Sequence, residues 1–434
     1  MQKRDDAFSI TINDPDLIDE SAIIAMENIN DKLLLIFKEN SIYKLLTADL
    51  IDPQKTQPDT GHTYEKIAAI GAGSPYVARI FLQFKRIVDQ AFSEGTLKQR
   101  LLEQIWSLNE QLLLCAQFES NIREQLDEVM HKCNVLIEQN KSNCAIPALA
   151  KVKNLENDAK SFLLVGKQFL IDCFKLISLF TDLPLGARDE AHFDKHIKWL
   201  EQNRPAFEKL SSALNNDMFW IRRLSECRNA IEHPGPGQSL TIENTKLHPG
   251  NKFSLPTWSY DLTSRLNVQE LSVPVHQELD VYLNNMLYFL EDILLLCISE
   301  RLPSDGMLSI YKYNEEEIKP NCPIKYYCSL SAKFFFKAKT SLTLQGSKWH
   351  PDMIARTDLR ARYLTCWPEA CGLRVSEPTA NGKSHHVTQR AGSQEAPPLR
   401  LGKISDSLGP RYEECLLHHE SWKDCPRQRT GPCC

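Results

Sequence analysis

The sequence predicts a mainly α-helical protein, with an up-and-down helical bundle at residues 151–302 that follows a long coiled-coil-like helical region at residues 1–150. Two observations predict this fold class. Apolar residues recur in alternating four- and three-residue steps along residues 97–139, which is typical of a long helix packed lengthwise on a partner. Four shorter helical patterns then follow, enough for a bundle. A small β-hairpin insertion, a strand-containing appendage at residues 303–346 and a disordered tail at residues 347–434 complete the prediction.

Composition and charge are those of an ordinary soluble globular protein. Of the 434 residues, 25% are charged and 42% are hydrophobic, and the net charge is −5. This mild negative charge argues against a protein that coats nucleic acid non-specifically, because such binding neutralises many phosphates. No apolar stretch follows the charged N-terminus, and no apolar run is long enough for a bilayer. We therefore expect a cytoplasmic protein with no membrane partner and with reduced cysteines.

The first part of the chain is expected to be helical. Apolar residues between Ile23 and Phe37 indicate a helix with a broad apolar face within residues 1–60. The polar stretch at residues 52–61 is typical of a linker. A second helix is predicted at residues 74–93, where apolar side chains again recur at helical spacing.

Residues 97–139 are the most regular segment. The positions of the apolar seam are Leu101, Ile105, Leu108, Leu112, Cys115, Glu119, Ile122, Leu126, Val129, Cys133 and Leu136. Glu119 is the one polar residue among them, and we expect it to fix the register or to face a gap. The partner of this helix stays open between intramolecular packing, against residues 74–93 or 155–182, and a dimeric coiled coil.

The bundle is predicted from four helical patterns. They cover residues 155–183, residues 189–214 with a break, residues 216–233 and residues 275–302. Asparagine, serine and proline before the first of these helices interrupt the periodicity, which places a domain boundary near residue 150. Between the third and fourth helices, short β-prone pieces separated by Pro-Gly and Pro predict the hairpin insertion.

The composition changes abruptly near residue 346. Before it, strand-like pieces at residues 308–313 and 324–336 predict a small appended sheet. All 18 Phe precede residue 346, whereas 6 of the 14 Cys follow it, and no periodicity remains. Such a stretch cannot bury enough apolar surface to order itself, so we expect disorder. The change also fits a non-native tail, read out of frame or joined from another source, which stays a hypothesis.

The helix predicted at residues 216–233 has clear end signals. Asn216 or Asp217 is expected to cap its start, because either side chain accepts from the unpaired backbone N–H groups of the first turn. Pro234 is expected to end it, because proline donates no backbone hydrogen bond and disfavours helical geometry at the preceding residue. A loop rich in glycine and proline follows at once.

The last turn of this helix is expected to contain a cationic, an amide and an imidazole side chain close together. Residues four apart share a helix face, so Asn229 is expected beneath His233 and Arg228 beneath Glu232. A functional site is one interpretation. The other is an ordinary capped helix end with a surface Arg228–Glu232 pair, because cations complement the negative end of a helix.

The sequence Arg228-Asn-Ala-Ile-Glu-His233 resembles the signature of the HEPN-domain family: an arginine, a polar residue, three further residues and a histidine on a helix of a small bundle. The resemblance covers at most about residues 155–302. It implies an HEPN-like bundle that cleaves RNA without a metal or cofactor, with two such helices meeting across a homodimer. It also implies a role in bacterial defence or as the toxin of a toxin–antitoxin pair. RNA, a second copy of the chain and an antitoxin or regulatory protein are the partners expected.

The resemblance implies that Arg228, Asn229 and His233 are catalytic and that Glu232 supports them. The ribose 2′-hydroxyl would attack the adjacent phosphorus and leave a 2′,3′-cyclic phosphate. His233 would transfer a proton, Arg228 would hold the phosphate, and Asn229 would orient either group. Two alternatives remain open: a non-catalytic helical module that binds RNA, a nucleotide or a protein, and a coiled-coil adaptor.

Other candidates for chemistry are weaker. His192 and His196 lie four apart on a predicted helix and could share a metal ion, but no third ligand is evident. Cys366 and Cys371 lack a second pair at zinc-site spacing, and the His-His pair at residues 385–386 is isolated. We therefore predict no metal site. The sequence also contains no glycine-rich phosphate loop and no Gly-x-Ser-x-Gly motif.

Overall fold

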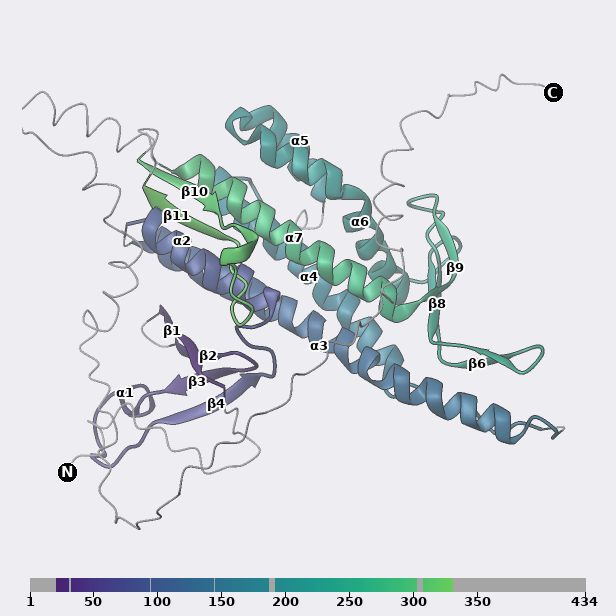
Figure 1. Ribbon diagram of the computed structural model, residues 1–434. Helices are drawn as coiled ribbons and strands as arrows, with labels where there is room; N and C mark the ends of the chain where they lie inside the picture. The colour runs from purple at the N-terminus through teal and green to yellow at the C-terminus, as the bar shows by residue number, and fades with distance from the viewer. Residues whose placement is uncertain are drawn as a thin grey trace, which may run out of the picture. The chain divides into compact units, whose positions relative to one another are not determined.

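The computed structural model describes residues 21–30, 33–93, 95–143, 145–186, 192–302 and 307–330 (Figure 1). Among these residues 54% are helical and 20% lie in strands, with several small sheets, so the protein is of the α+β class. The prediction of a mainly α-helical fold is therefore wrong. The tail predicted to be disordered at residues 347–434 lies outside the described residues.

Runs of strands and runs of helices follow one another along the chain. The helices are α1 (Ala48–Ile51), the π-helix η3 (Tyr76–Leu82), α2 (Gln83–Ala91), α3 (Thr96–Gln139), α4 (Leu155–Thr181), α5 (Phe193–Asn203), α6 (Glu208–Glu232) and α7 (Val275–Arg301), with short 3-10 turns η4 (Pro205–Phe207) and η5 (Glu315–Glu317). The strands are β1 (Ile23–Asn30), β2 (Leu33–Lys38), β3 (Ile42–Leu46), β4 (Thr63–Ala68), β5 (Ser239–Glu243), β6 (Lys246–His248), β7 (Lys252–Ser254), β8 (Thr257–Asp261), β9 (Gln269–Pro274), β10 (Leu308–Lys312) and β11 (Tyr326–Leu330). They form four antiparallel sheets, in the orders β1-β2-β3-β4, β5-β8-β9, β6-β7 and β10-β11.

The four-stranded sheet occupies the region where a helix was predicted. Residues 33–37 are apolar at every position, a pattern that fits either a buried helix or a strand covered on both faces. Leu35 and Phe37 belong to the main core, where the ring of Phe37 stacks on that of Phe81 with centroids 5.4 Å apart. Ile36 packs with Tyr43 in a second, smaller cluster. Successive side chains of β2 thus lie on opposite faces and contact different apolar neighbours. A strand can bury both of its faces in this way, whereas a helix with one apolar stripe buries only one face.

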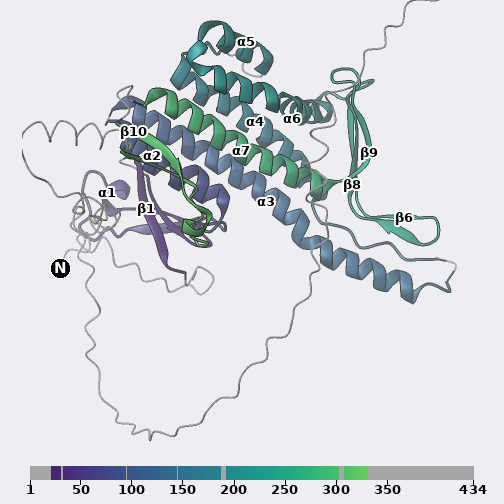
Figure 2. The same cartoon turned by 45° about the horizontal axis from the view of Figure 1, so that its top comes forward.

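Helix α3 is the long helix that the heptad pattern predicts. Its seam is buried from Leu101 to Cys133, and α4, α7 and η3 pack against it within the same chain (Figures 1 and 2). The intramolecular alternative for its partner is therefore the one that the structure shows. Glu119, the polar seam residue, is buried, and its carboxylate lies 3.3 Å from Arg123 Nε on the next turn. One hydrophobic core continues across residue 150, where a domain boundary was predicted.

Helix α6 is longer than predicted. It begins at Glu208, so the prediction that Asn216 or Asp217 caps its start is wrong. Asp217 lies inside the helix and accepts a hydrogen bond from Trp220 Nε1 at 2.9 Å. The prediction of its other end is confirmed, because the helix ends at Glu232 and His233 is the C-cap. Helices α4, α6 and α7 pack on one another beside α3 (Figure 2).

The predicted insertion after α6 contains more strands than expected. It consists of the three-stranded sheet β5-β8-β9 and the separate hairpin β6-β7. Gly237 connects α6 to β5 with a φ of 68°, and a Cβ there would lie 2.8 Å from Thr263 Oγ1. Its carbonyl accepts from the backbone N–H of Ser264 at 3.0 Å. Glycine therefore lets the loop dock on the turn after β8, which holds the sheet at the end of α6.

A buried polar network attaches the hairpin β10-β11 to the helices. Gln83 accepts from the backbone N–H groups of Lys325 and Tyr326, both at 2.8 Å. Its amide nitrogen donates to Glu291 of α7 at 3.2 Å, and Arg79 of η3 donates from Nε to the same carboxylate oxygen at 3.0 Å. The Glu291 carboxylate thus connects α7 to η3 through Arg79, and to β11 through Gln83.

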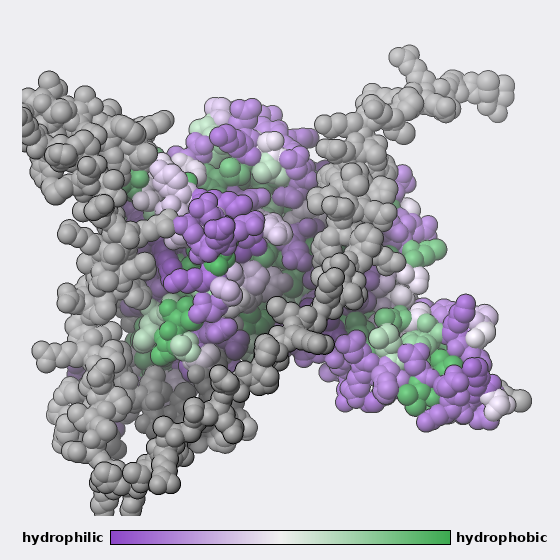
Figure 3. Space-filling view, viewed as in Figure 1, coloured by the Kyte–Doolittle hydropathy of each residue, from purple (hydrophilic) through white to green (hydrophobic). Residues whose placement is uncertain are grey.

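Helix α7 is long and apolar enough to cross a membrane by length and composition alone. However, 61% of its most apolar window is buried inside the molecule, and a core helix of a soluble protein passes the same test. On the face of the molecule in Figure 3, hydrophilic residues are interleaved with smaller hydrophobic patches. Most of that window therefore lies in the core of the molecule.

Candidate functional site

The predicted catalytic residues lie at the C-terminal end of α6, where the chain continues toward β5 (Figure 1). His233 has a φ of −132°, outside the helical range, as expected for a residue before proline. Its backbone N–H still donates to the carbonyl of Asn229 at 2.8 Å. The imidazole is thus carried on the first non-helical residue, and its side chain is 77% exposed.

Arg228 and His233 both lie near the same carboxylate oxygen of Glu232. Arg228 Nη1 forms an ion pair with Glu232 Oε2, and His233 Nε2 lies 3.9 Å from the same oxygen. The side chain of Arg228 is 23% exposed, so the guanidinium is partly buried but reaches the surface. The structure therefore brings the predicted cation and imidazole together, with the predicted supporting carboxylate between them.

Lys167 of α4 joins these residues from the neighbouring helix, and the sequence analysis did not identify it. Its Nζ donates to Asn229 Oδ1 at 2.8 Å. Burial lowers the pKa of the Lys167 ammonium, and the positive charge of Arg228 lowers it further, while Glu232 and Glu226 raise it. A half-buried ammonium whose pKa is lowered beside a second cation is typical of functional sites.

A close approach of α4 and α6 places Lys167 against Asn229. Gly166, the residue before it, is buried, and a Cβ at this position would lie 3.2 Å from Leu224 Cδ1 of α6. Glycine therefore allows the two helices to approach at this level. A lysine next to a glycine inside an otherwise apolar helical pattern is the signal in the sequence that points to this position.

The site combines groups that bind anions with a group that transfers protons. The guanidinium of Arg228, the ammonium of Lys167 and the amide of Asn229 are hydrogen-bond donors suited to a phosphate. Imidazole is the side chain that most commonly exchanges protons near neutral pH. Together, the residues at the end of α6 can hold a phosphate and move a proton beside it.

The weaker metal candidates do not assemble into a site among the described residues. His196 is buried in α5, where its ring lies 5.5 Å from that of Phe174, and His192 precedes the first residue of that helix. No group of three His, Cys, Asp or Glu within the described ranges could hold a metal ion. Cys366, Cys371 and the pair at residues 385–386 lie outside those ranges.

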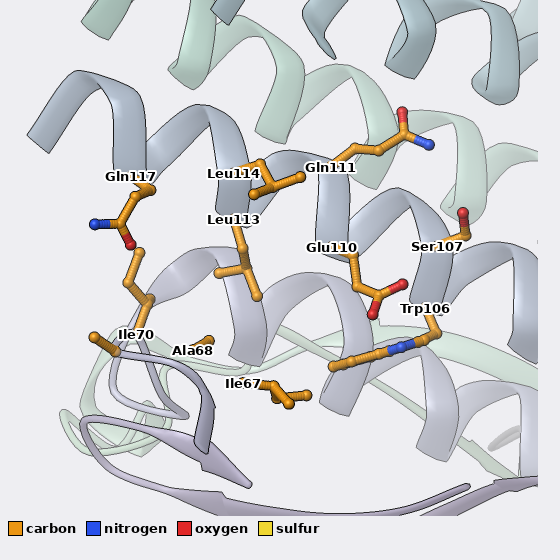
Figure 4. A pocket seen from close by; sticks show the side chains of 11 residues that line it. Ile67, Ala68, Ile70, Trp106, Ser107, Glu110, Gln111, Leu113, Leu114 and Gln117 are labelled. Atoms are coloured by element: carbon orange, nitrogen blue, oxygen red, sulfur yellow. The ribbon is translucent and has the colours of Figure 1, made fainter. Parts of the chain in front are cut away.

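A separate pocket of about 390 Å³ lies between α3 and the end of β4 (Figure 4). Its walls are mostly apolar and include Ile67, Ile70, Trp106, Leu113 and Leu114. Burial raises the pKa of the Glu110 carboxyl, which faces this pocket. No arginine, lysine or histidine lines it, so the pocket lacks the groups that bind phosphate at the end of α6.

Comparison with models of protein families, with curated proteins and with solved structures finds no match to this chain. The function must therefore be argued from the chemistry of Arg228, Asn229, Glu232, His233 and Lys167.

Proposed function

We propose that this protein is a metal-independent endoribonuclease that cleaves RNA by attack of the 2′-hydroxyl, with Arg228, Asn229 and His233 as its catalytic residues. The observation that carries the proposal is the convergence of Arg228 and His233 on one carboxylate oxygen of Glu232. A phosphate oxygen of RNA at that position would contact the guanidinium and lie 3.9 Å from the imidazole Nε2. The resemblance of residues 228–233 to the HEPN signature supports the same reaction.

The reaction is an in-line transesterification. The 2′-oxygen forms a bond to phosphorus while the bond from phosphorus to the 5′-oxygen breaks, which leaves a 2′,3′-cyclic phosphate and a 5′-hydroxyl. One proton leaves the 2′-hydroxyl and one reaches the 5′-oxygen, and His233 serves one of these transfers. General acid–base catalysis of this kind contributes about 10²–10⁴-fold. Arg228 stabilises the additional negative charge on the phosphoryl oxygens in the transition state.

A homodimer would complete the site. In-line displacement uses one proton acceptor and one proton donor, and each chain supplies one histidine at the end of α6. Two such ends facing each other across a two-fold axis would supply both. The 77% exposure of the His233 side chain leaves it accessible to a second copy. We place this activity in the cytoplasm, in a defence or toxin–antitoxin role, with an antitoxin or regulatory protein as a further partner.

The proposal is tested by incubating the pure protein with mixed RNA in the presence of EDTA. We expect the wild type to produce fragments with 2′,3′-cyclic phosphate and 5′-hydroxyl ends, and Arg228→Ala and His233→Ala to lose at least about 10² in rate. Arg222→Ala is a matched control, because Arg222 is exposed on the same helix and pairs with Asp194. His248→Ala is a second control, on the hairpin β6-β7, where His248 contacts Ser254 at 3.0 Å. Both controls should cleave like the wild type.

Cleavage by His233→Ala at the wild-type rate would overturn the mechanism. RNA binding without cleavage in the wild type would favour the non-catalytic binding module instead. Because the end groups identify the reaction, a contaminating nuclease that leaves other ends is recognised in the same experiment.

A further inference from the structure

The contact between Lys167 and Asn229 determines how the amide of Asn229 is oriented. An ammonium can only donate hydrogen bonds, so the amide atom that faces Lys167 at 2.8 Å must be the oxygen. The Nδ2 group, with its two N–H donors, then points away from Lys167. Within the described part of the chain, no hydrogen bond engages these two donors. Asn229 therefore presents donors, and not an acceptor, on the side away from α4.

A purely structural role accounts poorly for a lysine at this position. Its ammonium is half-buried and lies within the electrostatic influence of Arg228, which disfavours the charged form. The charged residues that act on it are Arg228, Glu226 and Glu232, all from α6. A neutral donor, such as a glutamine, could hold the same amide oxygen without burying a charge. An ammonium here also adds positive charge beside Arg228, which favours the binding of an anion next to it.

We propose that Lys167 is a positioning residue, which holds the side chain of Asn229 so that its amide N–H groups, together with the guanidinium of Arg228, bind the phosphodiester monoanion of RNA. The inference rests on the proposed function and deepens it, because it names the donors that recognise the scissile phosphate. Lys167 acts through Asn229 and through its charge, and it transfers no proton.

Three substitutions separate this role from simple packing. Asn229→Asp keeps an oxygen facing Lys167 and makes the contact an ion pair, but it replaces the two donors with a second acceptor. Lys167→Met removes the donor and the charge at similar length, and Lys167→Arg keeps both. The probe is an RNA oligonucleotide with methylated 2′-hydroxyls, which cannot react by transesterification, so its Kd reports binding alone. Unmodified RNA gives kcat and KM, and thermal unfolding gives Tm.

We expect Asn229→Asp to fold with an unchanged or higher Tm, yet to bind the methylated RNA at least about tenfold more weakly. A hydrogen bond to a charged group is lost and a like charge meets the phosphate. Lys167→Met should weaken binding about three- to tenfold, and Lys167→Arg should restore it. Lys160→Met is the matched control on α4, because Lys160 lies on the same helix and pairs with Glu156. It should bind like the wild type.

The proposed function and the positioning role of Lys167 predict different failures. If Arg228→Ala and His233→Ala abolish cleavage but Asn229→Asp binds and cleaves like the wild type, the positioning role of Lys167 and the catalytic role of Asn229 are overturned. The endoribonuclease activity through Arg228 and His233 then stands. If the wild type neither cleaves RNA nor binds the methylated oligonucleotide, the proposed function is overturned, and the inference with it. Should Lys167→Met fail to fold, Asn229→Asp alone still decides.

Discussion

Arg223 of α6 donates from Nε to the hydroxyl of Tyr282 of α7 at 2.9 Å, and from Nη2 to Glu278 Oε1 at 2.6 Å. Burial raises the pKa of the Glu278 carboxyl, and Arg223 opposes that effect. Arg223 precedes Arg228 by little more than one turn of the same helix. The site is therefore built on a helix that a largely buried ion pair attaches to α7.

The first prediction concerns this ion pair. Glu278→Leu leaves the largely buried guanidinium of Arg223 without its counter-charge, so we expect a loss of about 3–5 kcal/mol in the free energy of unfolding. The double substitution Arg223→Met with Glu278→Leu should recover most of that loss, because both desolvated charges are then absent. Urea unfolding of the two single variants and the double variant measures the coupling. Additive losses in the double variant would contradict the prediction.

The second prediction is a loss of stability at alkaline pH. Burial raises the pKa of the Cys227 thiol to about 12 and that of the Tyr76 hydroxyl to about 12. It also raises the pKa of the thiols of Cys115 and Cys297. Above the ordinary thiol value of 9.0, the unfolded chain releases protons that the folded chain retains, so unfolding becomes more favourable as pH rises.

The stabilisation from these thiols is thus fully present below pH 9 and is lost as the pH rises toward about 12. At pH 10 each buried thiol should account for a loss of about 1.4 kcal/mol. The lowered pKa of Lys167 acts in the opposite direction, because there the unfolded chain binds the proton more tightly. Urea unfolding in reductant at pH 8, 9 and 10 measures the slope, and Cys227→Ala should reduce it. A flat profile between pH 8 and pH 10 would be inconsistent with this account.

The third prediction concerns Glu232. Its carboxylate occupies the position between Arg228 and His233 that a phosphate would take, so substrate must displace it. We expect Glu232→Gln to bind the methylated RNA up to about fivefold more tightly, which matches the roughly 1 kcal/mol of an ion pair that solvent reaches. Fluorescence anisotropy at several salt concentrations measures the change.

Glu243→Gln is the control for this third prediction, because Glu243 forms an exposed ion pair with Lys246 and not with Arg228 or His233. It should leave the affinity unchanged. Weaker binding by Glu232→Gln would mean that Glu232 orients Arg228 for the phosphate and does not compete with it.

The parts of the fold that could be predicted from sequence are those with strong local signals. The heptad pattern identifies α3 to within one residue at its start, and Pro234 identifies the end of α6, because each signal lies within the element that it defines. The sheet β1-β2-β3-β4 was missed. The apolar run at residues 33–37 has no period of its own, and its neighbours on both faces belong to other elements.

In the candidate site, too, some contacts could be predicted from the local sequence and others depend on the packing of different elements. Arg228, Asn229, Glu232 and His233 lie within six consecutive positions of one helix end, so the sequence alone determined that they would be near one another. Tertiary structure alone decided that Lys167 joins them, because its contact with Asn229 spans 62 positions of the chain and depends on the close packing of α4 on α6. Helical periodicity determines which residues of one helix share a face. It cannot determine which face of another helix they will meet, because that depends on how all the apolar surfaces are buried together.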